Sequence, residues 1–399
     1  MSQEARDELA GGPLSKCADE ACVPISAAGR SSHWQASLLR QGDRGIEQLD
    51  DEVVDHNVDW LLAQCDQAHK AVLVLRDDSG RVVPLFVHDG QVDIGFGSTA
   101  VCAVKIRRHV LVGNFPESPP VDWSAAMNAL AEMMPSNGAV FLLGVVRDEG
   151  LGQALASGAL KRSFFVCEHG AEYARRLCVL GNSLDEYLAS LPAKSRQDLR
   201  RSIRRFESNF AGRFEFSTSC STAEVTDFLN RVEAVSKRTY QARQHGLGIV
   251  ADSYIGNKVI EGALRGYARC YLLTVDGQPV AWRIGFLFNE VYSSHHVGYD
   301  PDFEKWHPGV VLHLHSVRDL SENFMGVHTL DMLYGDNDFK RKASNLSRIE
   351  RNYYLFPRTP RGWATSFALR SFNGLSGLIG WVLDRAGVKV AIRRWLRRA

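Results

Sequence analysis

The residues best suited to chemistry cluster around the end of a predicted strand, His328 to Leu333. Asp331 lies near the end of this strand, and Tyr334, Asp336 and Lys340 follow it. In open α/β sheets, ligands bind beyond the carboxyl ends of the strands. A carboxylate there could accept a proton, and a lysine could hold developing negative charge. We therefore take these four residues as candidate catalytic groups, with an ordinary polar surface turn as the alternative.

Two adjacent histidines, His295 and His296, lie on the preceding predicted strand, Val291 to Gly298. Neighbouring strand residues face opposite sides, so we expect only one histidine to face the site. Imidazole titrates near neutral pH, which makes His296 a candidate proton acceptor. The alternative is a strand histidine that is hydrogen-bonded by a neighbour, and the pair does not have the spacing of a metal site.

A helix start between these segments is suited to binding an anion. Pro308 and Gly309 open a predicted apolar helix that continues from Val310 to about Leu320. The free N–H groups and the dipole of a helix N-terminus favour negative charge, and glycine permits close approach. Pro308, Gly309 and Val310 are therefore candidate binding residues. A simple Pro-Gly helix start is the alternative.

An arginine-rich helix is predicted upstream, from Lys194 to Arg205. Its apolar stripe consists of Leu199, Ile203 and Phe206, which anchors one face. The basic residues occupy the other faces: Lys194, Arg196, Arg200, Arg201, Arg204 and Arg205. Such an array suits a partner that carries phosphate, and Arg200 and Arg204 are our candidate contacts. A solvated face paired with acidic neighbours is the alternative.

Composition excludes several classes of protein. The chain has 399 residues, a formal net charge of +1 and 45% hydrophobic residues, an ordinary globular balance. A net charge this close to zero gives no reason to expect nucleic-acid binding by the molecule as a whole. The 8 cysteines are scattered without metal spacing, so we expect no metal and a reducing, cytoplasmic location. We also expect neither a signal peptide nor a membrane span.

The order of predicted elements indicates an α/β protein with a mixed sheet and flanking helices. We expect a disordered segment over 1–33, an N-terminal unit over 34–170 and a C-terminal unit over 171–357. The first unit begins with a predicted helix and hairpin, and the second with a predicted strand, Arg175 to Leu180, and a short helix. Residues 358–399 form a predicted basic helical tail, rich in arginine and carrying Trp381 and Trp395. This amphipathic pattern suits either peripheral contact with the inner membrane surface or a solvated basic edge.

A family resemblance covers about residues 180–356. It rests on Gly298-Tyr299-Asp300-Pro301 followed by Pro308-Gly309, on Asp331 with Gly335-Asp336 and Phe339-Lys340, and on the arginine-rich helix. In their order and spacing these features resemble the GNAT-like acyltransferases of the CelD/BcsL type, relatives of the Fem aminoacyl-tRNA transferases. The resemblance implies a tandem of two GNAT-like units, the first of them degenerate.

The resemblance also implies an activity: N-acyl transfer from acyl-CoA to an amine of a small-molecule or envelope- or polysaccharide-related acceptor. Lys340 would steady the oxyanion, and the start of the helix at Pro308 would hold the pyrophosphate of the co-substrate. Only Gly309 remains of the family's glycine-rich loop. Charged tRNA as the donor, as in the Fem relatives, is therefore one alternative. A non-catalytic scaffold at the membrane surface is the other.

Overall fold

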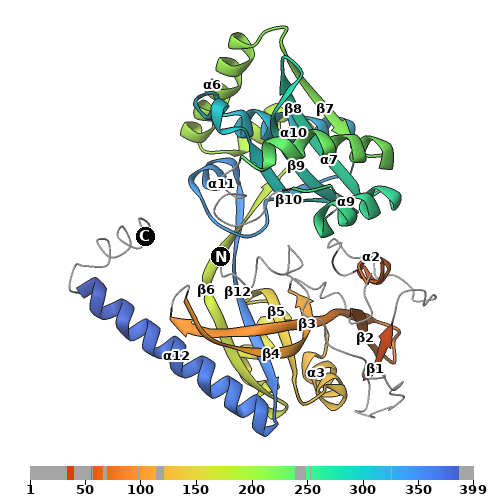
Figure 1. Ribbon diagram of the computed structural model, residues 1–399, viewed down its shortest axis with the longest axis vertical. Helices are drawn as coiled ribbons and strands as arrows, with labels where there is room; N and C mark the ends of the chain where they lie inside the picture. The colour runs from red at the N-terminus through yellow and green to blue at the C-terminus, as the bar shows by residue number, and fades with distance from the viewer. Residues whose placement is uncertain are drawn as a thin grey trace.

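The computed structural model describes residues 34–39, 55, 57–65, 70–96, 99–113, 121–238, 249–251, 253–324 and 326–385 (Figure 1). The predicted segment 1–33 and the tail beyond Arg385 lie outside these residues. A single twelve-stranded mixed sheet with helices on both faces forms the fold. This confirms the predicted α/β class.

The first half of the chain supplies the first six strands. They are β1 (Trp34–Leu39), β2 (Ala71–Asp77), β3 (Val82–Phe96), β4 (Thr99–Val112), β5 (Gly138–Val146) and β6 (Phe164–Val179). Its helical segments are α2 (Val58–Ala63), α3 (Trp123–Met133), α4 (Gly150–Ser157) and the 3₁₀ turn η2 (Ala159–Arg162).

The second half supplies the other six strands. They are β7 (Phe214–Ser219), β8 (Ala268–Val275), β9 (Gln278–Phe288), β10 (Val291–Tyr299), β11 (Thr329–Asp331) and β12 (Leu346–Pro357). Its helical segments are α5 (Leu184–Ser190), α6 (Ala193–Asn209), α7 (Thr222–Ser236), α9 (Tyr254–Leu264), η3 (Pro301–Trp306), α10 (Pro308–Asn323), α11 (Asp338–Ala343) and α12 (Pro360–Arg385).

The two halves of the sheet have matching strand orders when each is followed inward from its own edge. It runs β1-β2-β3-β4-β5-β12-β6-β11-β10-β9-β8-β7. In each half three antiparallel pairings are followed by one parallel pairing, β4 with β5 and β10 with β11. One helix, α3 or α10, precedes the parallel partner in each case. This correspondence shows two similar units in tandem, which residue identities alone did not reveal.

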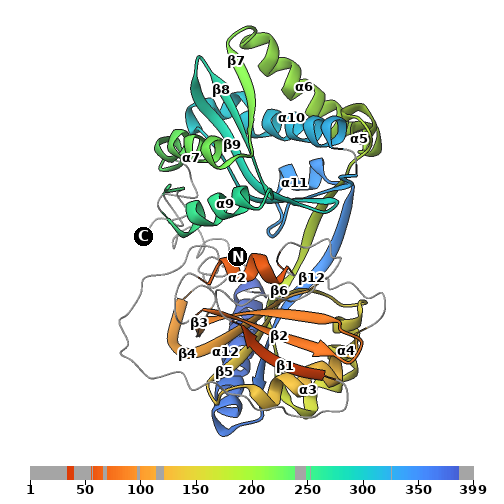
Figure 2. The same ribbon diagram turned by 90° about the vertical axis from the view of Figure 1, so that its right-hand side faces the viewer.

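The two units exchange their last strands. β6, at the end of the first unit, pairs with β11 of the second, and β12 pairs with β5 of the first. β6 and β12 also pair with each other along most of their length. Figure 2 shows them running between the two lobes. The expected boundary between residues 170 and 171 therefore falls inside β6.

Helices cover both faces of the second unit's sheet. One core packs α5, α6 and α10 on one face, and the other packs α7 and α9 on the opposite face. Helix α2 of the first unit joins this second core, where the Trp60 and Phe286 rings lie 4.9 Å apart. The junction between the units is therefore partly built on a buried aromatic pair.

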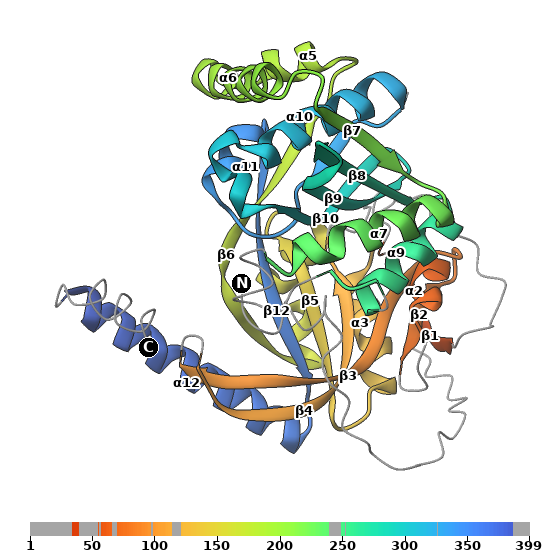
Figure 3. The same cartoon turned by 45° about the horizontal axis from the view of Figure 1, so that its top comes forward.

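Helix α12 returns to the first unit and lies against β3, β6 and β12 (Figures 1 and 3). It confirms the predicted helix as far as Arg385. No described helix is long and apolar enough to cross a membrane.

Candidate functional site

The second unit opens where β10 and β11 separate. The two strands pair only from Val291 to Ser293, opposite Thr329 to Asp331. β10 then continues to Tyr299 with β9 alone as its described strand neighbour. In the first unit, β4 and β5 stay paired over six residues, to Val112 and Leu143. Only the second unit thus has a short parallel pairing that leaves the end of one strand beside a gap in the sheet.

A buried charge cluster lies at the end of β11. The Arg175 side chain, on β6, donates from Nε to Asp331 Oδ2 at 2.8 Å, and its Nη1 lies 3.6 Å from Glu350 Oε1. All three side chains are buried. Burial alone would lower the pKa of Arg175, but the Asp331 and Glu350 carboxylates raise it well above its usual value. Asp331 is therefore held as a structural carboxylate, with Oδ1 accepting the Leu333 N–H at 2.8 Å.

Lys340 lies next to this cluster, on α11. Its ammonium group donates to the carbonyls of Met332 at 2.5 Å, Tyr334 at 2.6 Å and Leu333 at 3.4 Å. Burial lowers the pKa of Lys340 to about 8. Three carbonyls account for its three donors. In this structure Lys340 therefore holds the loop between β11 and α11, in which Leu333 has a φ of 52°.

Tyr334 and Asp336 have different surroundings, although both follow β11. The Tyr334 ring meets the Tyr173 ring edge to face at 5.9 Å, and burial raises the pKa of Tyr334 well above its usual value. Asp336 is exposed and pairs with Arg176 at 3.1 Å and Arg341 at 2.8 Å. The hydrogen bond from Arg176 lowers the pKa of Asp336, and both carboxylate oxygens accept from arginine side chains.

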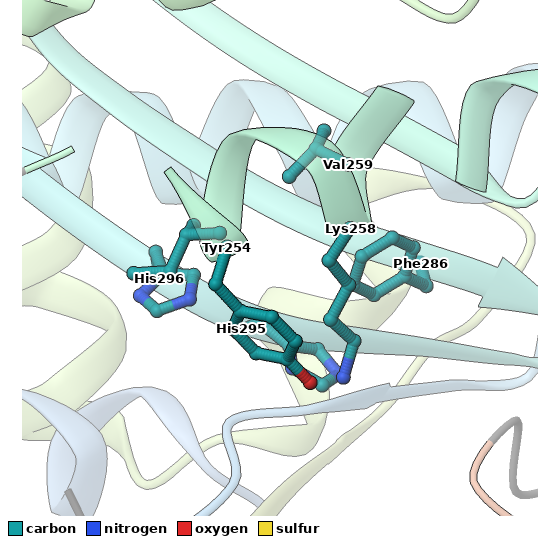
Figure 4. A pocket seen from close by; sticks show the side chains of 7 residues that line it. Tyr254, Lys258, Val259, Phe286, His295 and His296 are labelled. Atoms are coloured by element: carbon teal, nitrogen blue, oxygen red, sulfur yellow. The ribbon is translucent and has the colours of Figure 1, made fainter. Parts of the chain in front are cut away.

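A small pocket lies on the α9 side of β10 (Figure 4). Its lining is Tyr254, Ile255, Lys258, Val259, Phe286, His295 and His296. Both histidines line it, which corrects the expectation that only one faces the site. The reason is a β-bulge: Ser294 pairs with Gly285 and His296 with Ile284, which leaves His295 as an extra residue. A bulge interrupts the alternation of a strand.

Both pocket histidines are kept neutral at pH 7. Burial, together with the Lys258 ammonium, lowers the pKa of His296 to about 4 and that of His295 to about 3. A neutral imidazole retains a lone pair that can accept a proton. Ser293, two residues before His295, pairs with Asp331 of the charge cluster across β10 and β11. The pocket and the charge cluster are therefore neighbours at the junction of the two units.

The start of α10, which the sequence predicts as an anion site, has two of its N–H groups bonded: Val310 and Val311 both donate to the His307 carbonyl, at 3.0 Å and 3.2 Å. Pro308 is the first helical residue, and no side chain caps the helix. A Cβ built on Gly309 would meet only Tyr299 Cδ1, at 3.7 Å, so there is room before this turn. The equivalent helix of the first unit, α3, is capped by its own carboxylate, with Asp122 Oδ1 accepting from Ala125 N–H at 3.0 Å.

The arginine-rich helix α6 has the predicted buried stripe of Leu199, Ile203 and Phe206. Arg200 pairs with Asp185 at 2.7 Å, and the other candidate contact, Arg204, is exposed. The guanidinium of Arg205 lies 5.0 Å from the Trp306 ring. Since Trp306 ends η3, just before α10, the second half of α6 lies beside the start of that helix.

The structure thus brings together three of the predicted catalytic residues, Asp331, Tyr334 and Lys340, with His296 in the neighbouring pocket. Asp336 points outward into ion pairs. Pro308 to Val310, at the start of α10, lie on the sheet face that also carries α11, opposite the His296 pocket. Sequence reasoning missed the charged partners of these groups, which lie on β6, β9 and β12: Arg175, Arg283 and Glu350. A charged residue inside an apolar strand was an available signal for Arg283. Arg175 and Glu350 lie in strands that carry several charged residues, so this signal is absent there.

No group of three or more histidine, cysteine, aspartate or glutamate residues in the described part of the chain could hold a metal ion.

Comparison with known proteins identifies the fold of this half. Residues 193–341 match the acetyltransferase (GNAT) domain family. That segment contains α6, the β10–β11 gap, α10 and Lys340. No curated protein matches the chain. The second unit thus has a GNAT-type transferase fold, while the CelD/BcsL type remains a resemblance.

Several solved structures match the chain at low sequence identity. FemX matches with a TM-score of 0.52 and 13% identity, over 76% of this chain and 92% of its own. A tandem GNAT protein from the clavulanic acid biosynthesis pathway matches with a TM-score of 0.46 and 12% identity, over 82% and 99%. A protein of unknown function from Bacteroides thetaiotaomicron matches with a TM-score of 0.49 and 15% identity, over 76% and 92%. The FemX similarity shows a common fold and does not define a reaction.

Proposed function

We propose that this protein is an N-acyltransferase that moves an acyl group from acyl-CoA to an amine of a small-molecule or envelope-related acceptor. One observation carries the proposal: in the unit that matches the GNAT family, β10 and β11 separate beside a helix start that no side chain caps. The gap would admit the thioester, and the positive end of the α10 dipole at Gly309 would receive the pyrophosphate.

The first unit supports this assignment by contrast. Its strands stay paired, and Asp122 occupies the start of α3 with negative charge. A carboxylate there repels a phosphate and competes for the same N–H groups. We therefore assign the chemistry to the second unit and treat the first as degenerate.

The proposed reaction needs a proton acceptor and no covalent nucleophile on the protein. The amine nitrogen attacks the thioester carbon, the C–N bond forms, and the C–S bond breaks to release the thiol. We assign the amine proton to His296, which is neutral and lines the pocket. Lys340 steadies the oxyanion only if the loop carbonyls release one of its donors, so its first role is to hold that loop.

The experiment that tests the donor is a binding titration with CoA. Gly309→Asp places a carboxylate at the start of α10, so we expect weaker CoA binding with the fold retained. Gly374→Asp makes the same change at an exposed glycine of α12 with open space around it, and serves as the control. Equal CoA affinity in the wild type and in Gly309→Asp would remove CoA from this site.

Charged tRNA is the competing donor, and the exposed basic face of α6 favours it. Lys194, Arg201 and Arg204 make no ion pair with any described residue. Nuclease treatment separates the two donors, because only a tRNA-dependent activity is lost with the RNA. Changing Arg200, Arg201 and Arg204 to Gln should weaken donor binding and make its salt dependence shallower.

Contact with an anionic membrane surface is a separate proposal, and it also covers the alternative of a scaffold without catalysis. Helix α12 exposes Trp363, Phe367 and Leu375, and the rings of the first two stack at 5.5 Å. Arginines follow in the tail sequence. Aromatic side chains beside basic ones suit the interface of a bilayer. Turnover with any donor would argue against a purely structural role.

A further inference from the structure

Arg283, in the middle of β9, is a buried cation without a described acidic partner. Its side chain is 1% exposed. No carboxylate of the described residues lies within ion-pair distance, and Nε and Nη1 have no hydrogen-bond acceptor. By contrast, the neighbouring buried arginine, Arg175, contacts two carboxylates. A buried charge normally requires such compensation, because desolvation costs several kcal/mol.

A chain of buried hydrogen bonds fixes the position of this guanidinium. Arg283 Nη2 donates to His313 Nδ1 at 3.0 Å, so that nitrogen must be an acceptor. The His313 proton then lies on Nε2, which donates to the Tyr187 hydroxyl oxygen at 3.0 Å. Tyr187 in turn donates to the Ala343 carbonyl of α11. One edge of Arg283 is thereby tied to the core, while Nε and Nη1 are buried without an acceptor among the described residues.

The Arg283 guanidinium lies on the α10 side of the sheet, one strand away from the gap between β10 and β11. Arg283 pairs across the strands with Val297 of β10, and paired residues share a face. Val297 is 42% exposed, because β11 has already ended at this level. The His313 ring, which accepts from Arg283, also lies 5.3 Å from the Phe339 ring of α11, so Arg283 lies close to the helix that carries Lys340.

We propose that Arg283 binds a carboxylate group of the substrate. A planar guanidinium with unsatisfied donors matches a carboxylate in charge and geometry, and burial strengthens the contact. The proposal deepens the proposed function, on which it rests for the identity of the gap as the substrate site. It defines the substrate class: the acyl group or the acceptor amine carries a carboxylate near the reacting atoms.

The test measures anion-dependent stability of the full chain and needs no turnover. Thermal unfolding is followed with sodium acetate and with sodium chloride at equal ionic strength, and acetamide is the neutral isostere. We expect acetate to raise the unfolding temperature of the wild type through mass action, and acetamide to leave it unchanged. Inorganic phosphate in place of acetate shows whether the site prefers that anion.

Two variants identify the group responsible. Arg283→Met should abolish the acetate effect and should be as stable as the wild type in its absence, because it removes an uncompensated buried charge. Arg283→Lys keeps the positive charge but lacks the planar guanidinium with its paired donors, so we expect a reduced acetate effect. This variant replaces Arg283→Met in the test if the Met variant does not fold.

Three results would overturn the inference: no acetate effect in the wild type, an equal effect in Arg283→Met, or a stronger Arg283-dependent effect of phosphate. Failure of the proposed function gives a different pattern. In that case no amine is acylated with any donor, but the acetate effect and its loss in Arg283→Met persist.

Discussion

The neutral state of His296 makes the stability of the protein depend on pH in a calculable way. The pKa of His296 is lowered from 6.5 to about 4 by burial and by Lys258. Between these two values the unfolded chain binds a proton that the folded chain does not. Stability therefore rises with pH through this window and is lost as pH falls. At pH 5 the loss relative to pH 7.5 is about 2 kcal/mol, since each pKa unit is worth about 1.4 kcal/mol.

The assay compares urea unfolding of the wild type and His296→Gln at pH 7.5 and pH 5. The variant has no group that titrates at this position, so we expect it to lose about 2 kcal/mol less than the wild type on acidification. His295 contributes to both proteins in the same direction, because its pKa is also lowered. His328→Gln is the matched control, since its side chain is 65% exposed.

Two results would refute this reasoning. If the wild type and His296→Gln lose equal stability between pH 7.5 and pH 5, His296 is not buried in neutral form. If His328→Gln flattens the profile as much as His296→Gln does, the effect belongs to general surface charge.

Three further predictions concern other parts of the molecule. Arg175→Met leaves the Asp331 and Glu350 carboxylates buried without their cation. Urea unfolding should therefore show a free energy of unfolding lower by about 3–5 kcal/mol, and a decrease below about 1 kcal/mol would contradict the buried network. Lys340→Ala should lower kcat by more than about tenfold with little change in the donor KM, because the loop between β11 and α11 loses the ammonium group that holds it. Steady-state kinetics that give a kcat within about threefold of the wild type would exclude a role of Lys340 in turnover. Changing both Trp363 and Phe367 to Ser should reduce co-sedimentation of the protein with anionic vesicles. Leu264→Ser, a change at a similarly exposed apolar residue, should have no effect. Equal sedimentation of the wild type and both variants would show that α12 does not make the membrane contact.

The elements of the second unit were largely predictable because local signals specify them. The hairpin between β8 and β9 turns at Asp276 and Gly277, with φ values of 49° and 77°, as a two-residue Asp-Gly turn requires. The buried stripe of α6 follows from helical periodicity. Such features depend on residues a few positions apart.

Features that depend on distant residues were not predictable. The bulge that directs both His295 and His296 toward one pocket depends on the register between β10 and β9, which the sequence of β10 alone does not reveal. The partner of Asp331 is Arg175, 156 residues away. The roles of Lys340 and Arg283 likewise depend on which carbonyls and acids surround them after folding.

The strand exchange between the two units has a consequence for synthesis on the ribosome. The sheet of the first unit is completed by β12, and the N–H of Gly144 is bonded by Asn352, 208 residues further along. The first unit therefore waits for nearly the whole described chain to emerge before its last strand can pair. Until then the open side of β5 is an unpaired strand edge, which is a site for aggregation. We therefore expect the growing chain to be more prone to aggregation during synthesis than a chain of two sequential domains.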